Sequence, residues 1–99
     1  TLCGWYKVLD PEDLKLSQKY MNNANTPKRQ IHWDFIRLAL ASVADLCIIP
    51  LQDYLGLGSE ARINTPSTLG NNWRWRMNQG GLTKELADQI RELTTLYGR

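Results

Sequence analysis

The chain has 99 residues, which is enough for one modest domain at most. Its 12 Lys and Arg against 10 Asp and Glu leave a formal charge of +2 spread along the whole length, whereas nucleic-acid binding usually needs a concentrated basic face. No apolar run reaches the roughly 18 residues of a membrane span and no signal-peptide pattern opens the chain, so we expect a soluble protein that binds neither nucleic acid nor a membrane.

The first predicted helix begins after Asp10 and runs to about Met21. Asp10 suits an N-cap, a proline follows at the first helical position, and acidic residues in the first turn complement the helix dipole. We expect this helix to bury Leu14 and Tyr20 together with Met21. A turn-rich connector with the sequence NNANTPKRQ separates it from the next helix.

A second helix is predicted over about residues 32–43, because apolar residues recur there at spacings of three and four and form one inward stripe. The stripe consists of Trp33, Ile36, Leu40 and Val43. His32, the lone histidine, opens this helix. It has no nearby Ser, Cys or metal-ligand partner in the sequence, so we interpret it as a cap or packing residue.

An apolar run without alternation, LCIIPL, follows from Leu46 to Leu51. This pattern predicts a strand that is covered on both faces, as in a parallel sheet wrapped by helices. Gln52 and Asp53 stand where such a strand would end, the edge at which α/β folds collect their binding groups. A parallel strand needs neighbouring strands, and no second strong candidate is visible, so we expect residues 1–99 to be an incomplete domain of a larger protein.

A long loop from Gln52 to Leu82 separates the strand from a third predicted helix, which opens near Thr83 and ends at a Gly98 cap. Loops of this length are usually functional or disordered, and the apolar residues within this one favour an ordered, functional loop. The order helix, helix, strand, long loop, helix indicates an α/β fold. It is typical of the closing part of a βα barrel or of an open α/β sheet.

Polar side chains gather in the long loop, and these are Asp53, Glu60, Arg62 and Asn64. Carboxylates and amides hydrogen-bond sugar hydroxyls or anionic groups. The alternative is that Glu60 and Arg62 form a salt bridge within the loop. Pro66 restricts the backbone before it, so the Asn64-Thr65-Pro66 corner either holds the Asn64 amide over a ligand or only turns the chain.

The segment Trp73-Arg74-Trp75-Arg76 alternates as a strand would, with two indoles on one face and two guanidinium groups on the other. Such a face stacks sugars or bases, so a small binding module for carbohydrate or single-stranded nucleic acid is one alternative function. We favour the interpretation in which both tryptophans pack beneath the loop.

The remaining candidates carry no chemistry. Gly56 and Gly58 lack the third glycine and the following helix of a dinucleotide site. Cys3 and Cys47 are too few for a disulfide framework or a zinc site, so we expect two reduced, structural cysteines. The sequence predicts no metal and no cofactor.

Residues 31–77 resemble the C-terminal part of the amylomaltases, also called 4-alpha-glucanotransferases or disproportionating enzymes. The resemblance is carried by the motif IRLALASVA, by a P-x-QD-x-LGLGSEARxN-x-P core, and by a finish similar to GNWxWR. It implies an α-amylase-like (β/α)8 TIM barrel. Residues 1–99 would then be a C-terminal fragment of that catalytic barrel, mostly helical, with one buried parallel strand and a long active-site loop.

The resemblance also implies an activity, the transfer of 1,4-α-glucan segments between maltodextrins with retention. Such transfer needs a carboxylate nucleophile and an acid/base, which would lie upstream of Thr1, so we expect no catalytic residue here and an inactive isolated piece. The implied partners are a maltodextrin or another α-1,4-glucan and the remainder of the barrel. A hydrolytic α-glucan-acting barrel is the alternative enzyme.

The loop is what the resemblance assigns to substrate binding. The part that matches residues 58–68 resembles a lid, in which Asn64 binds sugar near the scissile bond and Pro66 holds its geometry. Ser67 stands where many members have glycine, which leaves the mobility of the lid open. The implied location is the cytoplasm, or the plastid stroma in a photosynthetic eukaryote.

Overall fold

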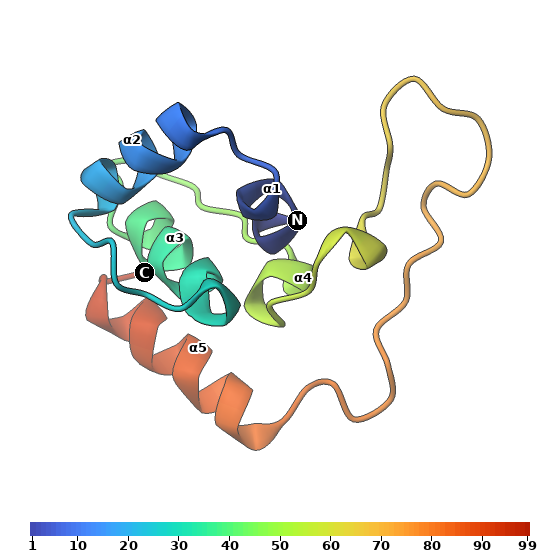
Figure 1. Ribbon diagram of the computed structural model, residues 1–99. Coiled ribbons are helices and arrows are strands. Elements are labelled where there is room, and N and C mark those ends of the chain that lie inside the picture. The colour runs from blue at the N-terminus through green and yellow to red at the C-terminus, as the bar shows by residue number, and fades with distance from the viewer.

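The computed structural model describes residues 1–99 and consists of helices joined by irregular segments (Figure 1). The helices are α1 (Leu2–Lys7), α2 (Pro11–Met21), α3 (Ile31–Leu40), α4 (Leu51–Tyr54) and α5 (Lys84–Leu96), with short 3-10 turns η1 (Lys28–Gln30) and η2 (Ser59–Ala61). Helix α3 is the centre of the arrangement, because the other four helices all contact it. None of the helices has the length and apolar character to cross a membrane.

Helix α2 is confirmed with its predicted bounds. Asp10 Oδ1 accepts a hydrogen bond of 2.8 Å from the backbone N–H of Asp13, which is the expected N-cap. Leu14 and Met21 are half-buried against the core. The expected burial of Tyr20 is wrong, since 75% of this residue is exposed; α2 is a surface helix that no further element covers.

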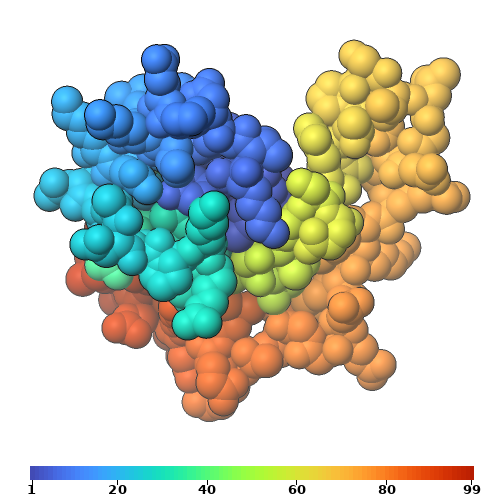
Figure 2. All heavy atoms as spheres, in the orientation of Figure 1, coloured from blue at the N-terminus to red at the C-terminus, as the bar shows by residue number.

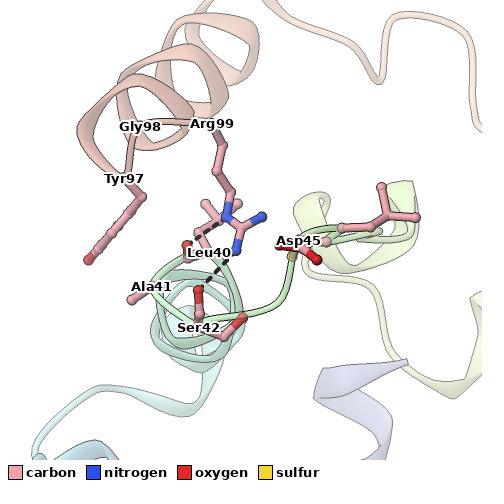
Figure 3. Close-up of a pocket in the computed structure, with 9 residues that line it drawn as sticks. Leu40, Ala41, Ser42, Asp45, Tyr97, Gly98 and Arg99 are labelled. Atoms are coloured by element: carbon pink, nitrogen blue, oxygen red, sulfur yellow. Dashed lines mark hydrogen bonds between the residues drawn. The ribbon is translucent and has the colours of Figure 1, made fainter.

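Helix α3 ends at Leu40, earlier than the predicted end near residue 43. The guanidinium group of Arg99 lies at this end (Figure 3). Arg99 Nε donates to the carbonyl of Leu40 at 2.8 Å, and a terminal nitrogen donates to the carbonyls of Ser42 and Ala44 at 3.0 and 2.7 Å. Carbonyls that a longer helix would have used are thus satisfied by a side chain, and Val43 is left fully exposed.

Helix α5 is confirmed at both ends. Thr83 Oγ1 accepts a hydrogen bond of 3.1 Å from the backbone N–H of Leu86. Gly98 follows the last turn with a φ of +70°, the left-handed conformation expected of a glycine after a helix. Leu93 is buried against Ile36 and Leu40 of α3, so this apolar contact attaches α5 to the central helix.

The buried core consists of two small clusters along α3. One contains Cys3, Tyr6 and Ile31, and the other contains Ile36, Leu40 and Leu93. The first depends on α1, a helix that the sequence analysis did not predict, in which Thr1 Oγ1 accepts a hydrogen bond of 3.1 Å from Gly4 N–H. Six residues form this helix, too few for apolar periodicity to be recognised.

The predicted buried strand does not form, and no strand is present in the chain. The segment from Leu46 to Pro50 is irregular, and its N–H groups make no backbone hydrogen bond. Leu46 and Ile48 are 74% and 80% exposed. A parallel strand forms only by pairing with a neighbouring strand. Residues 1–99 contain no such neighbour.

After α4 the chain leaves the other helices and forms a long arch, residues 55–83, that returns to α5 (Figure 1). Helix α4 begins at Leu51, so Gln52 and Asp53 lie in a helical turn rather than at a strand end. The arch then passes through η2 and projects away from the helices. Figure 2 shows the notch that separates the tip of the arch from α1 on one face of the molecule.

Candidate functional site

A cavity of about 230 Å³ lies where the arch leaves the helical body. It is lined by Thr1, Pro50, Gln52, Asp53, Ala61, Arg62, Ile63 and Asn64. Three of the four polar residues predicted to act together therefore do meet here, namely Asp53, Arg62 and Asn64. Glu60 does not line this cavity. The sequence analysis did not name Thr1 for this role, because only the fold brings the start of the chain to α4.

The two buried polar residues of α4 hold the cavity wall in place. Asp53 is 8% exposed, and its Oδ1 accepts a hydrogen bond of 2.8 Å from the backbone N–H of Leu2. Gln52 is 5% exposed and donates from Nε2 to the carbonyl of Ala61 at 3.3 Å. Through these bonds α4 is tied both to α1 and to η2, which fixes the floor from which the arch rises.

The alternative of a salt bridge between Glu60 and Arg62 is wrong. The one ion pair in the chain joins Lys84 to Asp88 at 2.9 Å. The Glu60 side chain instead bonds to nearby backbone, since its Oε1 accepts a hydrogen bond of 2.8 Å from Gly58 N–H. Hydrogen bonds from its own backbone N–H and from that of Gly58 lower the pKa of the exposed Glu60 carboxyl.

Arg62 is directed toward the backbone of the arch. Its Nε donates to the carbonyl of Asn64 at 2.8 Å. The carboxamide of Asn64 itself makes no hydrogen bond within the chain, and the residue is exposed at the cavity. Both its donor and its acceptor are therefore available to a ligand.

Pro66 is exposed next to this corner. The following residue, Ser67, has a φ of +62°, a left-handed conformation that glycine adopts at little cost. A glycine, which the resemblance to the amylomaltases implies at this position, would adopt this conformation without strain. Ser67 adopts the same kind of conformation without being a glycine.

His32 is a packing residue, as the sequence indicated. It is 5% exposed, its Nδ1 has no hydrogen-bond partner, and its ring lies 5.3 Å from that of Trp33. Burial lowers the pKa of the His32 imidazole, and the nearby Asp53 charge opposes this shift. A Cβ placed on Gly56 would come within 2.8 Å of His32 Cε1, so the turn after α4 packs directly on this ring.

The predicted alternation of Trp73 and Trp75 on one face is wrong, because the segment is not a strand. Trp73 is 77% exposed with a φ of +61°. Trp75 is half-buried and lines a separate cavity of about 140 Å³ together with Leu55 and Leu57. The favoured interpretation, packing beneath the loop, thus holds for Trp75 alone, and no platform of two indoles exists.

Known proteins of one family are similar to this chain. A family model described as 4-alpha-glucanotransferase matches residues 1–83. The chain is 42% identical over 102 residues to the chloroplastic/amyloplastic 4-alpha-glucanotransferase of Arabidopsis thaliana, and 43% identical over 100 residues to the 4-alpha-glucanotransferase of Synechocystis. In both cases the match covers 100% of this chain, but 17% and 19% of the relative.

A solved structure is also similar. The amylomaltase from Streptococcus agalactiae in complex with acarbose aligns with a TM-score of 0.87 and 34% sequence identity, covering 97% of this chain and 19% of that one. The chain thus spans about a fifth of the length of the proteins it matches. Since the family model covers most of the sequence and the fold agrees as well, the chain belongs to the 4-alpha-glucanotransferase family.

Proposed function

We propose that this chain works as the C-terminal part of a 4-alpha-glucanotransferase that moves 1,4-α-glucan segments between maltodextrins with retention. The observation that carries the proposal is the agreement over the whole chain with 4-alpha-glucanotransferases of plants and bacteria. The chain contributes a substrate-binding loop. The nucleophile and the acid/base that retention requires come from the rest of the protein.

The exposed apolar segment Leu46–Leu51 supports the proposal that this chain is one part of a larger protein. Leu46 and Ile48 are largely exposed, and a mainly apolar cavity of about 430 Å³ lies between α3 and the segment from Ile48 to Pro50. Leaving such surface in water is costly, about 25 cal/mol per Å². We infer that Leu46–Leu51 becomes a parallel strand of a TIM barrel when the rest of that barrel pairs with it.

Asn64 is the residue that we assign to the glucan. Its carboxamide is exposed at the cavity and can donate to one sugar hydroxyl while it accepts from another. Pro66, two residues later, restricts the backbone of the corner. We assign no role in binding or catalysis to Asp53, because its carboxylate is buried and accepts a hydrogen bond from the N–H of Leu2.

The first experiment incubates the full-length protein that contains these residues with maltotriose. We expect glucose together with maltodextrins longer than maltotriose, because a second sugar replaces water at the covalent intermediate. Chromatography of the products decides the matter. Hydrolysis products alone would favour the hydrolytic barrel and overturn the proposed transfer.

The second experiment tests Asn64 in the same full-length protein. Asn64→Ala removes a hydrogen-bonding group to the substrate, so kcat/KM for maltotriose should fall about tenfold or more. Asn78→Ala is the matched control, since the Asn78 side chain makes no hydrogen bond and its backbone carbonyl keeps the bond from Gly81. Equal kinetics for both variants would remove Asn64 from the site.

A further inference from the structure

The arch contains a closed loop, residues 63–73, whose ends are joined by one backbone hydrogen bond. The N–H of Trp73 donates to the carbonyl of Ile63 at 2.6 Å. Between these ends the loop has no apolar core: every residue from 64 to 71 is exposed, and Leu69 is fully so. Its shape must therefore come from polar bonds.

Those bonds converge on Asn72, the one residue between 64 and 74 that is half-buried. Asn72 Oδ1 accepts from the N–H of Thr65 at 2.9 Å. Asn72 Nδ2 lies 3.2 Å from both the carbonyl and the hydroxyl oxygen of Thr68. The hydroxyl of Thr68 in turn donates to the carbonyl of Thr65 at 2.6 Å.

The network is chemically consistent in one orientation of the carboxamide. If Asn72 were rotated by half a turn, its NH2 would face the N–H of Thr65 and its oxygen would face the carbonyl of Thr68. One contact would then place two donors face to face and the other two acceptors, so the partners of the carboxamide fix its observed orientation.

The same network grips the peptide bond that follows Asn64. The carbonyl of Asn64 accepts from Arg62 Nε at 2.8 Å, and the N–H of Thr65 donates to Asn72 at 2.9 Å. These two groups belong to one planar peptide unit. With both of its polar groups held, the unit is restrained from rotating, and this restrains the backbone position from which the Asn64 side chain starts.

The loop also contains backbone conformations that need such support. Ser67, Asn71 and Trp73 all have φ values between +57° and +62°. Left-handed conformations in residues other than glycine persist only where the surroundings enforce them. The bonds of Asn72 and the closure at Trp73 are the interactions available to do so.

We propose that Asn72 is a positioning residue for the transferase reaction, which acts through Asn64 by clamping the Asn64–Thr65 peptide. This rests on the proposed function, in which Asn64 binds the glucan. Asn72 touches no sugar in this scheme. Its effect on turnover passes through the orientation of the Asn64 carboxamide, and Arg62 completes the clamp from the opposite side.

The test is a double-mutant cycle in the full-length enzyme with maltotriose as substrate. Asn72→Ala should lower kcat/KM about tenfold, because a misplaced binding group loses much of its effect. In the Asn64→Ala background the same change should alter kcat/KM by less than about twofold, since two residues that act through one contact are not additive. Equal losses in both backgrounds would overturn the proposal.

Two aspartate variants provide a matched pair. Asn72→Asp sets a carboxylate oxygen against the carbonyl of Thr68 and should behave like Asn72→Ala. Asn71→Asp adds the same charge one residue earlier, at a side chain whose sole hydrogen bond is one of 3.5 Å from Arg74, and aspartate tolerates the left-handed conformation there. It should keep the wild-type kcat/KM. Similar losses in both variants would point to charge alone and contradict the clamp.

A readout without activity separates this inference from the proposed function. Chymotrypsin cleavage of this loop, after the exposed Leu69 or Trp73, should be several times faster in Asn72→Ala than in the wild type or Asn71→Asp, because a loop without its clamp opens more often. If the wild-type enzyme forms no products longer than maltotriose, the proposed function fails. Faster cleavage of Asn72→Ala would still support the clamp in that case. Unchanged cleavage overturns the clamp whatever the activity.

Discussion

Gly56 combines a left-handed backbone with a close neighbour at the position that a Cβ would occupy. Its φ of +65° is unfavourable for any other residue, and a Cβ would lie 2.8 Å from Cε1 of the buried His32. The left-handed conformation costs alanine about 1–2 kcal/mol, and overpacking adds about 1–3 kcal/mol. Gly56→Ala should therefore lower the free energy of unfolding of the full-length protein by about 2–5 kcal/mol, measured by urea denaturation.

Gly80 separates these two contributions. Its φ of +77° is similar, but nothing lies within 4 Å of the position of a Cβ. Gly80→Ala should cost only the conformational part, about 1–2 kcal/mol. If the two variants were equally unstable, the contact between Gly56 and His32 would contribute nothing.

The structural roles of some single residues could be predicted from the sequence, and those of others could not. The packing role of His32 could be predicted, because a lone histidine beside apolar residues has few other uses. The exposure of Asn64 at a cavity agreed with its position after the apolar run. The bonds of Asn72 could not be predicted, since they depend on three left-handed residues and on partners that only the folded loop brings within reach.

At the level of elements, the end of α3 depends on a side chain that follows α5 in the chain. Arg99 donates to three carbonyls there, and a guanidinium group suits this because its donors lie in a fixed plane. In the full-length protein, Arg99→Gln should speed hydrogen exchange at residues 40–42 about tenfold, a change of about 1.4 kcal/mol in local opening.

The matched control lies in α5 itself. Arg91 is exposed and makes no hydrogen bond or ion pair, so Arg91→Gln should leave exchange at the end of α3 unchanged. Arg99→Lys should recover only part of the protection, since one ammonium group cannot reach all three carbonyls in a fixed geometry. Full recovery by lysine would mean that charge alone, acting on the helix dipole, accounts for the effect.

Elements with local signals could be predicted, and those that need distant partners could not. The caps of α2 and α5 involve residues within one turn of each other, so the sequence contains the whole interaction. The apolar run at Leu46–Leu51 predicted a strand covered on both faces, but a strand is defined by pairing, and no strand forms among these residues. The early end of α3 was missed for the same reason, because Arg99 lies 59 residues from Leu40.

The molecule as a whole exposes more surface than a self-contained domain. Its accessible area is 7671 Å², about a third more than the roughly 5,800 Å² expected of a folded monomer of this size. The Cα radius of gyration is 14.6 Å, above the roughly 13 Å of a compact domain of 100 residues. Twelve residues are buried, in separate small groups.

These quantities predict how the isolated 99 residues should behave. Without a contiguous core they should show no cooperative thermal transition by calorimetry, no near-UV circular dichroism of fixed aromatic packing, and no transferase activity. Helical signal in the far ultraviolet should remain, since α2 and α5 have their own caps. A sharp, two-state melting curve would show that the chain folds alone and would contradict the proposal that it completes a larger barrel.

The bonds of Asp53 and Arg99 set an order of events during synthesis. Asp53 reaches back 51 residues to Leu2, and Arg99 reaches back 55 to 59 residues to the end of α3. Contacts of such sequence separation form late, and α1 cannot bind its partner until residue 53 has left the ribosome. The contact between α1 and α4 can therefore form before α5 has been synthesised, while the end of α3 stays uncapped until Arg99 has followed α5 out of the ribosome.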